Sequence, residues 1–186
     1  QEESLIPDPK VIRSVLDLCT GSACLAILAA KVFGNAELVA TDLSGDALQV
    51  ARVNVDKHGL ASRITLLEGD LFSTLKNHQF DLILANPPYV AEAEAEAFDA
   101  EYQAEPRMAH VSGHDGFDIT RRILKEASDY LSEEGLLICE IGTGRELLEE
   151  EFPQLPFLWL DTEFSEGEVF ALAKADFNNK EFNEDI

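Results

Sequence analysis

The chain has 186 residues, of which 46% are hydrophobic and 27% charged, and this composition predicts one soluble globular domain with a sizeable core. Its 14 Lys and Arg against 36 Asp and Glu give a formal net charge of −22, which disfavours direct binding to a nucleic-acid backbone and favours basic partners. No apolar run approaches the ~20 residues that span a bilayer and the polar start lacks a signal-peptide pattern, so we expect a cytoplasmic protein without membrane contacts.

Cysteine and histidine usage gives no sign of a disulfide framework or a metal site. Cys19, Cys24 and Cys139 are odd in number, lie in apolar stretches and lack a C-x-x-C spacing, so we expect reduced, buried thiols. His110 and His114 stand four residues apart in a polar stretch, and such a single pair is more often solvated than metal-bound. The sequence therefore predicts no metal site.

Short apolar or β-branched runs alternate with longer helical patterns along most of the chain, which is typical of βαβ units. The predicted strands are, in chain order, residues 15–19, 38–41, 64–67, 80–85, 136–141, 157–161 and 168–173. The predicted helices are residues 23–33, 46–58 and 118–131, with a further acidic helix in the Ala-Glu run at 91–96. Ser44 is expected to cap the second helix.

The last two predicted strands differ from the others in how they are connected. Residues 162–167 are too few for a helical crossover and suit an antiparallel hairpin. The chain is therefore expected to be an α/β protein with a mostly parallel seven-stranded sheet, helices on both faces and a C-terminal antiparallel hairpin.

Three polar features follow the first three predicted strands, at the edge of the sheet where α/β proteins bind ligands. The turn at residues 17–23 presents backbone N–H groups and a helix N-terminus, and Gly21 lets a ligand come close. Asp42 can accept hydrogen bonds from ribose hydroxyls, while Asp70 can meet an adenine amino group that Leu71 flanks. Each feature also occurs as an ordinary turn or helix cap, and together they predict a nucleotide-like cofactor site.

The turn Asn86-Pro87-Pro88-Tyr89 directly follows the fourth predicted strand. The Asn86 amide oxygen and the Pro87 carbonyl are both acceptors, and Pro88 has no N–H to compete for that carbonyl. Two such acceptors can bind both hydrogens of a planar NH₂ group, against which Tyr89 offers an aromatic wall. A proline-rich turn with no such role is the structural alternative. We interpret the turn as a holder for a planar nitrogen that is to be methylated, because an amide nitrogen is a poor nucleophile and depends on positioning.

Together with the turn at 17–23, the chain resembles the protein N5-glutamine methyltransferases over residues 11–174. The stretches that carry the resemblance are Asp-Leu-Cys-Thr-Gly-Ser at 17–22, Asn-Pro-Pro-Tyr-Val at 86–90, Glu105-Pro106, Asp115-Gly116, Thr-Arg-Arg-Ile-Leu at 120–124 and Leu-Ile-Cys-Glu at 137–140. Within that family it looks closest to the branch acting on a large-subunit ribosomal protein, whereas the sister branch acts on peptide-chain release factors.

The resemblance implies a Rossmann-like class I S-adenosyl-L-methionine-dependent methyltransferase domain at residues 15–174, with S-adenosyl-L-homocysteine as the product of the cofactor. Residues 1–14 would be an N-terminal remnant or linker and 175–186 an acidic, flexible tail. Family members also carry an N-terminal helical recognition domain, whereas about 14 residues precede the first predicted strand here. Ala23 departs from the family as well, because Gly usually stands at this position.

By resemblance, the turn would hold the methionine part of the cofactor, Asp42 the ribose, and Asp70 with Leu71 the adenine. The implied cofactor residues are Asp17, Cys19, Thr20, Gly21, Ser22, Ala23, Asp42, Asp70, Leu71 and Asn86. The implied substrate residues are Asn86, Pro87, Pro88 and Tyr89, of which Asn86, Pro87 and Tyr89 are expected to be catalytic. A basic ribosomal protein suits the charge of −22, and a release factor is the less favoured substrate.

Other functions remain as alternatives. A nucleic-acid methyltransferase acting on an exocyclic amine can use the same Asn-Pro-Pro-Tyr turn, although it needs a basic face that 14 Lys and Arg residues hardly provide. A cofactor-binding module without catalysis is suggested by Ala23. A nicotinamide-dependent dehydrogenase is the weakest, because the glycine turn lacks the full G-x-G-x-x-G pattern.

Overall fold

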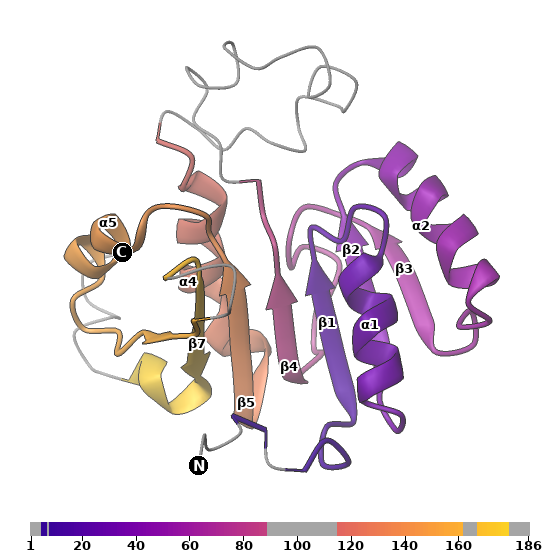
Figure 1. Ribbon diagram of the computed structural model, residues 1–186, viewed down its shortest axis with the longest axis horizontal. Helices are drawn as coiled ribbons and strands as arrows, with labels where there is room; N and C mark the ends of the chain where they lie inside the picture. Colours follow the sequence, from indigo (N-terminus) through magenta and orange to yellow (C-terminus); the bar gives the residue numbers. More distant parts are fainter. Residues whose placement is uncertain (1–4, 7, 89–114, 162–166, 179–186) are drawn as a thin grey trace. The chain divides into compact units, whose positions relative to one another are not determined.

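Strands form at the apolar runs that the sequence analysis identified. The structure is a computed structural model that describes residues 5–6, 8–88, 115–161 and 167–178 (Figure 1). The chain divides into two compact units, Gln1–Leu84 and Ala85–Ile186. The first unit contains β1 (Ser14–Leu18), α1 (Cys24–Val32), β2 (Glu37–Asp42), α2 (Gly45–Lys57), β3 (Ile64–Glu68) and β4 (Phe80–Ala85), whose last residue begins the second unit.

Parallel strands build the first unit, in the order β3-β2-β1-β4. Val15 of β1 lies opposite Leu38 of β2, which in turn lies opposite Ile64 of β3. Every residue of β1 from Val15 to Leu18 is buried, as expected for a parallel strand covered on both faces. Helix α1 contacts β1, β2 and β3, and α2 contacts β2 and β3 (Figure 1). The carboxyl ends of β1, β2 and β3 therefore share one edge of the unit.

Helix α2 begins and ends at the residues that its sequence favours. The Ser44 Oγ accepts a hydrogen bond from the Ala47 N–H at 3.2 Å, so the predicted cap is confirmed. Gly59 follows the helix with φ +68°, the left-handed conformation that glycine adopts without strain. Helix α1 differs from its prediction, since it starts at Cys24 and Ala23 precedes it as a left-handed N-cap residue.

Arg63 closes the C-terminal end of α1. Its guanidinium donates to the carbonyl oxygens of Ala30 at 2.8 Å and Phe33 at 2.8 Å. It also donates to the Ala36 carbonyl through Nη2 at 2.6 Å and Nε at 3.2 Å. One side chain thus gives a donor to the Ala30 carbonyl of the last helical turn and to the carbonyls of Phe33 and Ala36 in the segment that follows.

We expect Arg63→Ala to lower the free energy of unfolding by about 2 kcal/mol, because hydrogen bonds to a charged donor are lost and the Ala30 carbonyl loses its guanidinium donor. Urea denaturation followed by circular dichroism measures the change. Arg52→Ala is the matched control, because Arg52 is an exposed arginine of α2. Equal stability of the two variants would contradict this role for Arg63.

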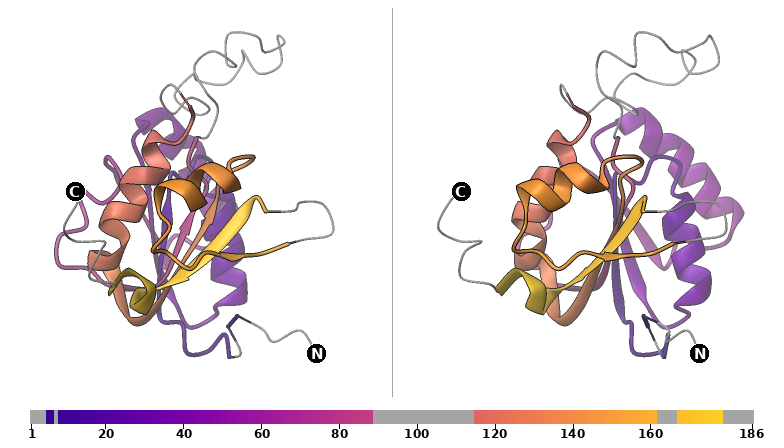
Figure 2. Two further views of the ribbon diagram at one scale, coloured as in Figure 1. Left: turned by 90° about the vertical axis from the view of Figure 1, so that its left-hand side faces the viewer. Right: turned by 60° about the vertical axis from the view of Figure 1, so that its left-hand side comes forward.

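The second unit contains the antiparallel part of the fold. Its elements are α4 (Asp118–Tyr130), β5 (Leu131–Glu140), α5 (Arg145–Glu151), β6 (Leu158–Trp159), β7 (Val169–Ala173) and the 3-10 helix η3 (Lys174–Asn178). Strand β7 lies between β5 and β6 and runs antiparallel to both, so the predicted C-terminal hairpin is confirmed. The Lys174 Nζ donates to the carbonyls of Ser128 and Leu131, which fastens η3 to the end of α4 (Figure 2).

With these strands, the predicted α/β class with seven strands is confirmed, and some boundaries are corrected. Strand β5 begins at Leu131 instead of 136, because Leu131 is extended and buried and the polar residues after it continue the strand. Strand β6 has two residues, Leu158 and Trp159, instead of the predicted five, and both pair with β7. Helix α5 was not predicted. Its glutamate-rich sequence buries Leu148 alone and so shows no apolar stripe.

Two further predictions concern cysteines and the ends of the chain. The three cysteines are free thiols, but only Cys139 is buried; Cys24 is exposed at the start of α1, which corrects the expectation for it. Residues 174–178 form η3 with Phe177 buried, while the division into segments at 14 and 174 stays a prediction.

The acidic helix expected at 91–96 lies outside the described residues. Among the described helices, none is long and apolar enough to cross a membrane.

Candidate functional site

Asp17 holds the turn that follows β1. The Asp17 side chain is 0% exposed, and its Oδ2 accepts from the Thr20 hydroxyl at 2.5 Å and from the Ala26 N–H at 3.0 Å. Its Oδ1 has no hydrogen-bond partner within the described part of the chain. The carboxylate therefore braces the turn and the first turn of α1 from inside, and leaves buried negative charge beneath the turn.

Burial raises the pKa of Asp17 from 3.8 to about 6, against the lowering effect of the hydrogen bonds from Thr20 and Ala26, and the charge of Asp42 raises it further. Between these two pKa values the folded chain holds a proton that the unfolded chain has released. The stability that this protonation contributes is complete below pH 3.8 and is lost as the pH rises through about 6.

Asp17→Asn removes this titration while it keeps the shape of the side chain. We expect the free energy of unfolding of the parent chain, relative to that of the variant, to fall by about 2 kcal/mol between pH 4 and pH 7. Urea denaturation of both proteins at several pH values gives this difference, in which the titrations of the other carboxyls cancel. A difference that does not change with pH would contradict the raised pKa of Asp17.

Strained backbone marks the expected cofactor residues of the first unit. Cys19 has φ 56°, Ala23 φ 64° and Leu71 φ 48°; among described non-glycine residues only Asn77 shares this region. Such conformations cost about 1–3 kcal/mol each and cluster at functional sites. Gly21 has φ 54°, and a Cβ built on it would meet no atom within 4 Å. The turn therefore has open space beside Gly21, and the Ala23 methyl points into the buried interior at 0% exposure.

Asp42 connects the end of β2 to this turn. Its Oδ2 accepts from the Gly21 N–H at 2.8 Å and its Oδ1 from the Ser44 N–H at 2.8 Å. A carboxylate has about four lone-pair sites, so two bonds leave capacity for ribose hydroxyls. The Asp42 carbonyl also accepts from the Gly69 N–H at 3.0 Å. This bond joins Gly69, the residue before Asp70, to the carboxyl end of β2.

Asn54 of α2 is a bracing residue that the sequence analysis missed. Its Nδ2 donates to the Ser22 carbonyl at 3.0 Å, so α2 also supports the turn. The first unit thus brings the turn, Asp42 and the Asp70 segment together. This edge offers open space beside Gly21, a helix N-terminus that suits a ligand carboxylate, and buried negative charge that suits a ligand cation. These features fit a cationic nucleoside that carries an amino acid, such as S-adenosyl-L-methionine.

The predicted nitrogen-holding turn lies at the start of the second unit. Asn86 is exposed and Pro87 is buried, and both directly follow β4. The Asn86 Nδ2 donates to the Glu140 Oε2 at 3.1 Å. Tyr89 lies outside the described residues, so its role stays a prediction.

Glu140 is the partner of Asn86 that sequence analysis left without a role. It is the last residue of β5 and pairs with Val169 of β7. Burial raises the pKa of the Glu140 carboxyl above its usual 4.5, and the nearby charge of Glu168 raises it further. The pair Asn86 and Glu140 is separated by 54 residues in sequence, and no local pattern connects them.

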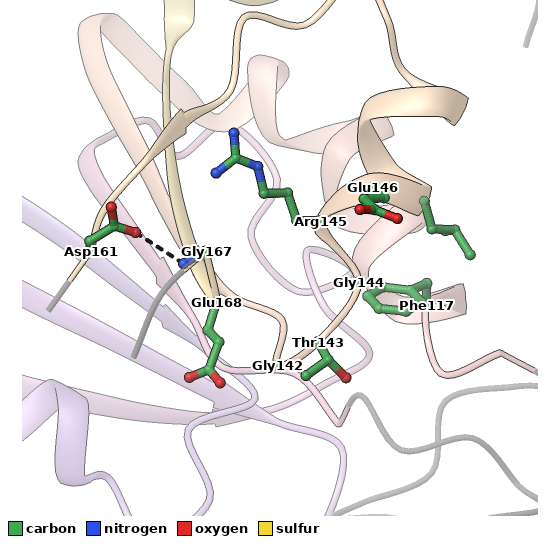
Figure 3. Close-up of a pocket in the computed structure, with 10 residues that line it drawn as sticks. Phe117, Gly142, Thr143, Gly144, Arg145, Glu146, Asp161, Gly167 and Glu168 are labelled. Atoms are coloured by element: carbon green, nitrogen blue, oxygen red, sulfur yellow. Dashed lines mark hydrogen bonds between the residues drawn. The ribbon is translucent and has the colours of Figure 1, made fainter. Parts of the chain in front are cut away.

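A cavity of about 690 Å³ adjoins the end of β5 (Figure 3). Its lining residues are Phe117, Gly142, Thr143, Gly144, Arg145, Glu146, Leu147, Asp161, Gly167 and Glu168. The Phe117 ring packs against Gly144 so closely that a Cβ there would lie 1.9 Å from the ring Cζ. Two of the lining residues are joined by a hydrogen bond, in which the Asp161 Oδ1 accepts from the Gly167 N–H at 3.0 Å. No sequence motif predicted this cavity.

Arg121 fixes the segment that enters α4, beside Phe117. Its Nη2 contacts the Asp115 Oδ2 at 2.5 Å and the Glu151 Oε1 of α5 at 2.7 Å. The guanidinium holds the pKa of Asp115 at about 2. Asp115 and Arg121 belong to the stretches that carried the family resemblance, and the structure gives them this bracing function.

Within the described ranges, no group of three or more His, Cys, Asp or Glu side chains could hold a metal ion. His110 and His114 lie outside these ranges.

The chain is similar in sequence to known methyltransferases. A family model described as methyltransferase small domain matches residues 4–102. A ribosomal protein uL3 glutamine methyltransferase from Bradyrhizobium diazoefficiens is 55% identical over 175 residues, which cover 94% of this chain and 55% of that protein. The protein of the same name from Burkholderia pseudomallei is 47% identical over 174 residues, covering 90% of this chain and 57% of that protein. The resemblance to glutamine methyltransferases is thereby confirmed, and the chain spans little more than half the length of these relatives.

Among solved structures, a ribosomal protein L11 methylase from Lactobacillus delbrueckii subsp. bulgaricus matches with a TM-score of 0.57 and 26% identity. The match covers 86% of this chain and 68% of that protein. It supports the fold expected from the sequence.

Proposed function

Since the chain belongs to the methyltransferase small domain family, we propose that it transfers a methyl group from S-adenosyl-L-methionine to the side-chain amide nitrogen of a glutamine in a large-subunit ribosomal protein. The relatives named for ribosomal protein uL3 support this substrate, at identities of 55% and 47%. The observation that carries the proposal is the exposed Asn86, which directly follows β4 and precedes the buried Pro87.

The cofactor would lie on the first unit. Asp42 would bind the ribose hydroxyls with the acceptor capacity that Gly21 and Ser44 leave on its carboxylate. The turn at residues 19–23 would take the methionine part, in the open space beside Gly21. Asp17 would act through the turn that it braces, because both of its oxygens are buried.

Asn86 and Pro87 would hold the substrate nitrogen. The Asn86 Oδ1 and the Pro87 carbonyl each accept one hydrogen of the glutamine NH₂, which fixes the plane of that group. S-adenosyl-L-methionine supplies a methyl group on a positively charged sulfur. Transfer to the held nitrogen would break the bond between the methyl carbon and sulfur, and the methylated nitrogen, positively charged at first, would release a proton to water. The two acceptors favour this nitrogen as its positive charge develops.

Charge supports a basic protein as the substrate. A net charge of −22 attracts a basic ribosomal protein and repels the backbone of RNA or DNA. A ribosomal protein substrate would also suit a reaction in the cytoplasm. An exocyclic amine of a nucleic acid would fit the same pair of acceptors, and the charge disfavours it.

The test supplies S-adenosyl-L-methionine with a tritiated methyl group to the chain together with ribosomal protein uL3, a release factor or ribosomal RNA. Label in uL3 above that in the release factor is the expected result. Label in RNA would replace the proposal with nucleic-acid methylation. If no substrate takes label while S-adenosyl-L-homocysteine binds in a calorimetric titration, the chain is a cofactor-binding module without catalysis.

A further inference from the structure

The orientation of the Asn86 amide decides whether the proposed site can bind its substrate. A carboxamide has an oxygen that accepts and an NH₂ that donates, and the two ends have similar shape. If the NH₂ end faced the substrate, two donors would oppose each other. Asn86 is exposed, and packing alone gives little reason for one orientation over the other.

Glu140 supplies that reason. An ionised carboxylate only accepts hydrogen bonds, so it can pair with the Asn86 Nδ2 and not with Oδ1. The distance from Nδ2 to the Glu140 Oε2 is 3.1 Å, within the usual range for such a bond. This hydrogen bond therefore forms only when the Asn86 Nδ2 faces Glu140, and in that orientation Oδ1 does not contact Glu140.

The fold holds Glu140 in place. Its neighbours Cys139 and Ile141 are both 0% exposed, and the Ile141 N–H donates to the Glu168 carbonyl at 2.8 Å. Because the end of β5 is paired with Val169 of β7 as well, the carboxylate stands on a strand instead of a free loop.

We propose that Glu140 is a positioning residue for methyl transfer, which accepts a hydrogen bond from the Asn86 Nδ2 and thereby directs the Asn86 Oδ1 to the substrate NH₂. This role rests on the proposed function. The negative charge also polarises the Asn86 amide, which makes Oδ1 a stronger acceptor as positive charge develops on the substrate nitrogen.

Two substitutions of Glu140 separate its effect on the orientation of the Asn86 amide from the effect of its charge, and a third substitution is the control. Glu140→Ala removes both and should lower kcat about 50-fold. Glu140→Gln keeps an acceptor for Nδ2 through its amide oxygen but loses the charge, so it should retain activity within about 5-fold of the parent chain. Glu134→Ala is the matched control, because Glu134 is an exposed glutamate of the same strand, and full activity is expected.

The test of this role measures kcat and KM with uL3 for each variant alone and for each variant combined with Asn86→Ala. Glu140→Ala should lower kcat in the parent chain, cause no further loss beside Asn86→Ala, and leave the affinity for S-adenosyl-L-homocysteine and the thermal midpoint unchanged. Equal losses in both backgrounds, or no rescue by glutamine, would overturn the role of Glu140 alone. A parent chain that transfers no methyl group to uL3 would overturn the proposed function, and this role with it.

Discussion

Asn86→Ala is expected to lower kcat about 1,000-fold and to leave the affinity for S-adenosyl-L-homocysteine unchanged. The alanine removes one of the two acceptors that fix the plane of the substrate NH₂, and removing a single aligned hydrogen-bonding group costs about 100–1,000-fold in comparable sites. The change also leaves Glu140 without the Nδ2 donor at 3.1 Å. Single-turnover kinetics with uL3, beside calorimetric titration of the cofactor product, measures both quantities.

Gln49→Ala is the control for Asn86→Ala, because Gln49 is an exposed amide whose only hydrogen bond among the described residues is to Asp46 of the same helix. It should keep full turnover. Full turnover of Asn86→Ala would place the nitrogen-holding group elsewhere, whereas a loss of cofactor affinity in that variant would support the cofactor contact of Asn86 that the family resemblance implies.

Asp42→Ala is expected to weaken binding of S-adenosyl-L-homocysteine about 100-fold. The carboxylate would accept two hydrogen bonds from the ribose hydroxyls, and bonds to a charged acceptor contribute about 1.5–3 kcal/mol each. Its loss also frees the Gly21 N–H, now held at 2.8 Å, so the turn that would take the methionine part loses its brace. Calorimetric titration gives the affinity, and urea denaturation shows how much of the effect is stability.

Asp46→Ala separates the ribose role from simple loss of an acidic residue near α2. Asp46 is exposed in the first turn of the helix and accepts from Gln49, so its removal should leave cofactor affinity unchanged. An Asp42→Ala chain that binds the product as tightly as this control would contradict the ribose role.

Features with a local cause were predictable from the sequence. Short apolar runs between helical patterns predicted the strands. Ser44, three residues before a helix N–H that has no partner within the helix, predicted the cap of α2. The short connection before Glu168 predicted the antiparallel hairpin, because no helix fits there.

Features that depend on distant residues were not predictable. Asn54 donates to Ser22, which lies 32 residues away in the sequence, and Asn86 donates to Glu140, which lies 54 residues away. The periodicity of the helices and strands predicts neither contact. Asp17 was expected to bind the cofactor, yet its Oδ2 bonds to Thr20 and Ala26, so only the fold reveals that this carboxylate serves the turn. Ala23 adopts a left-handed conformation at the start of α1, where its preference for helix favoured a longer helix.

The measurement that tests glutamine methylation most directly is tandem mass spectrometry of uL3 after reaction with the chain and S-adenosyl-L-methionine. We expect one added methyl group, located on the side-chain nitrogen of a glutamine, and strongly reduced at equal reaction time when Asn86→Ala replaces the parent chain. A methyl group on any other residue type, or unmodified uL3 beside methylated RNA, would contradict the proposed reaction.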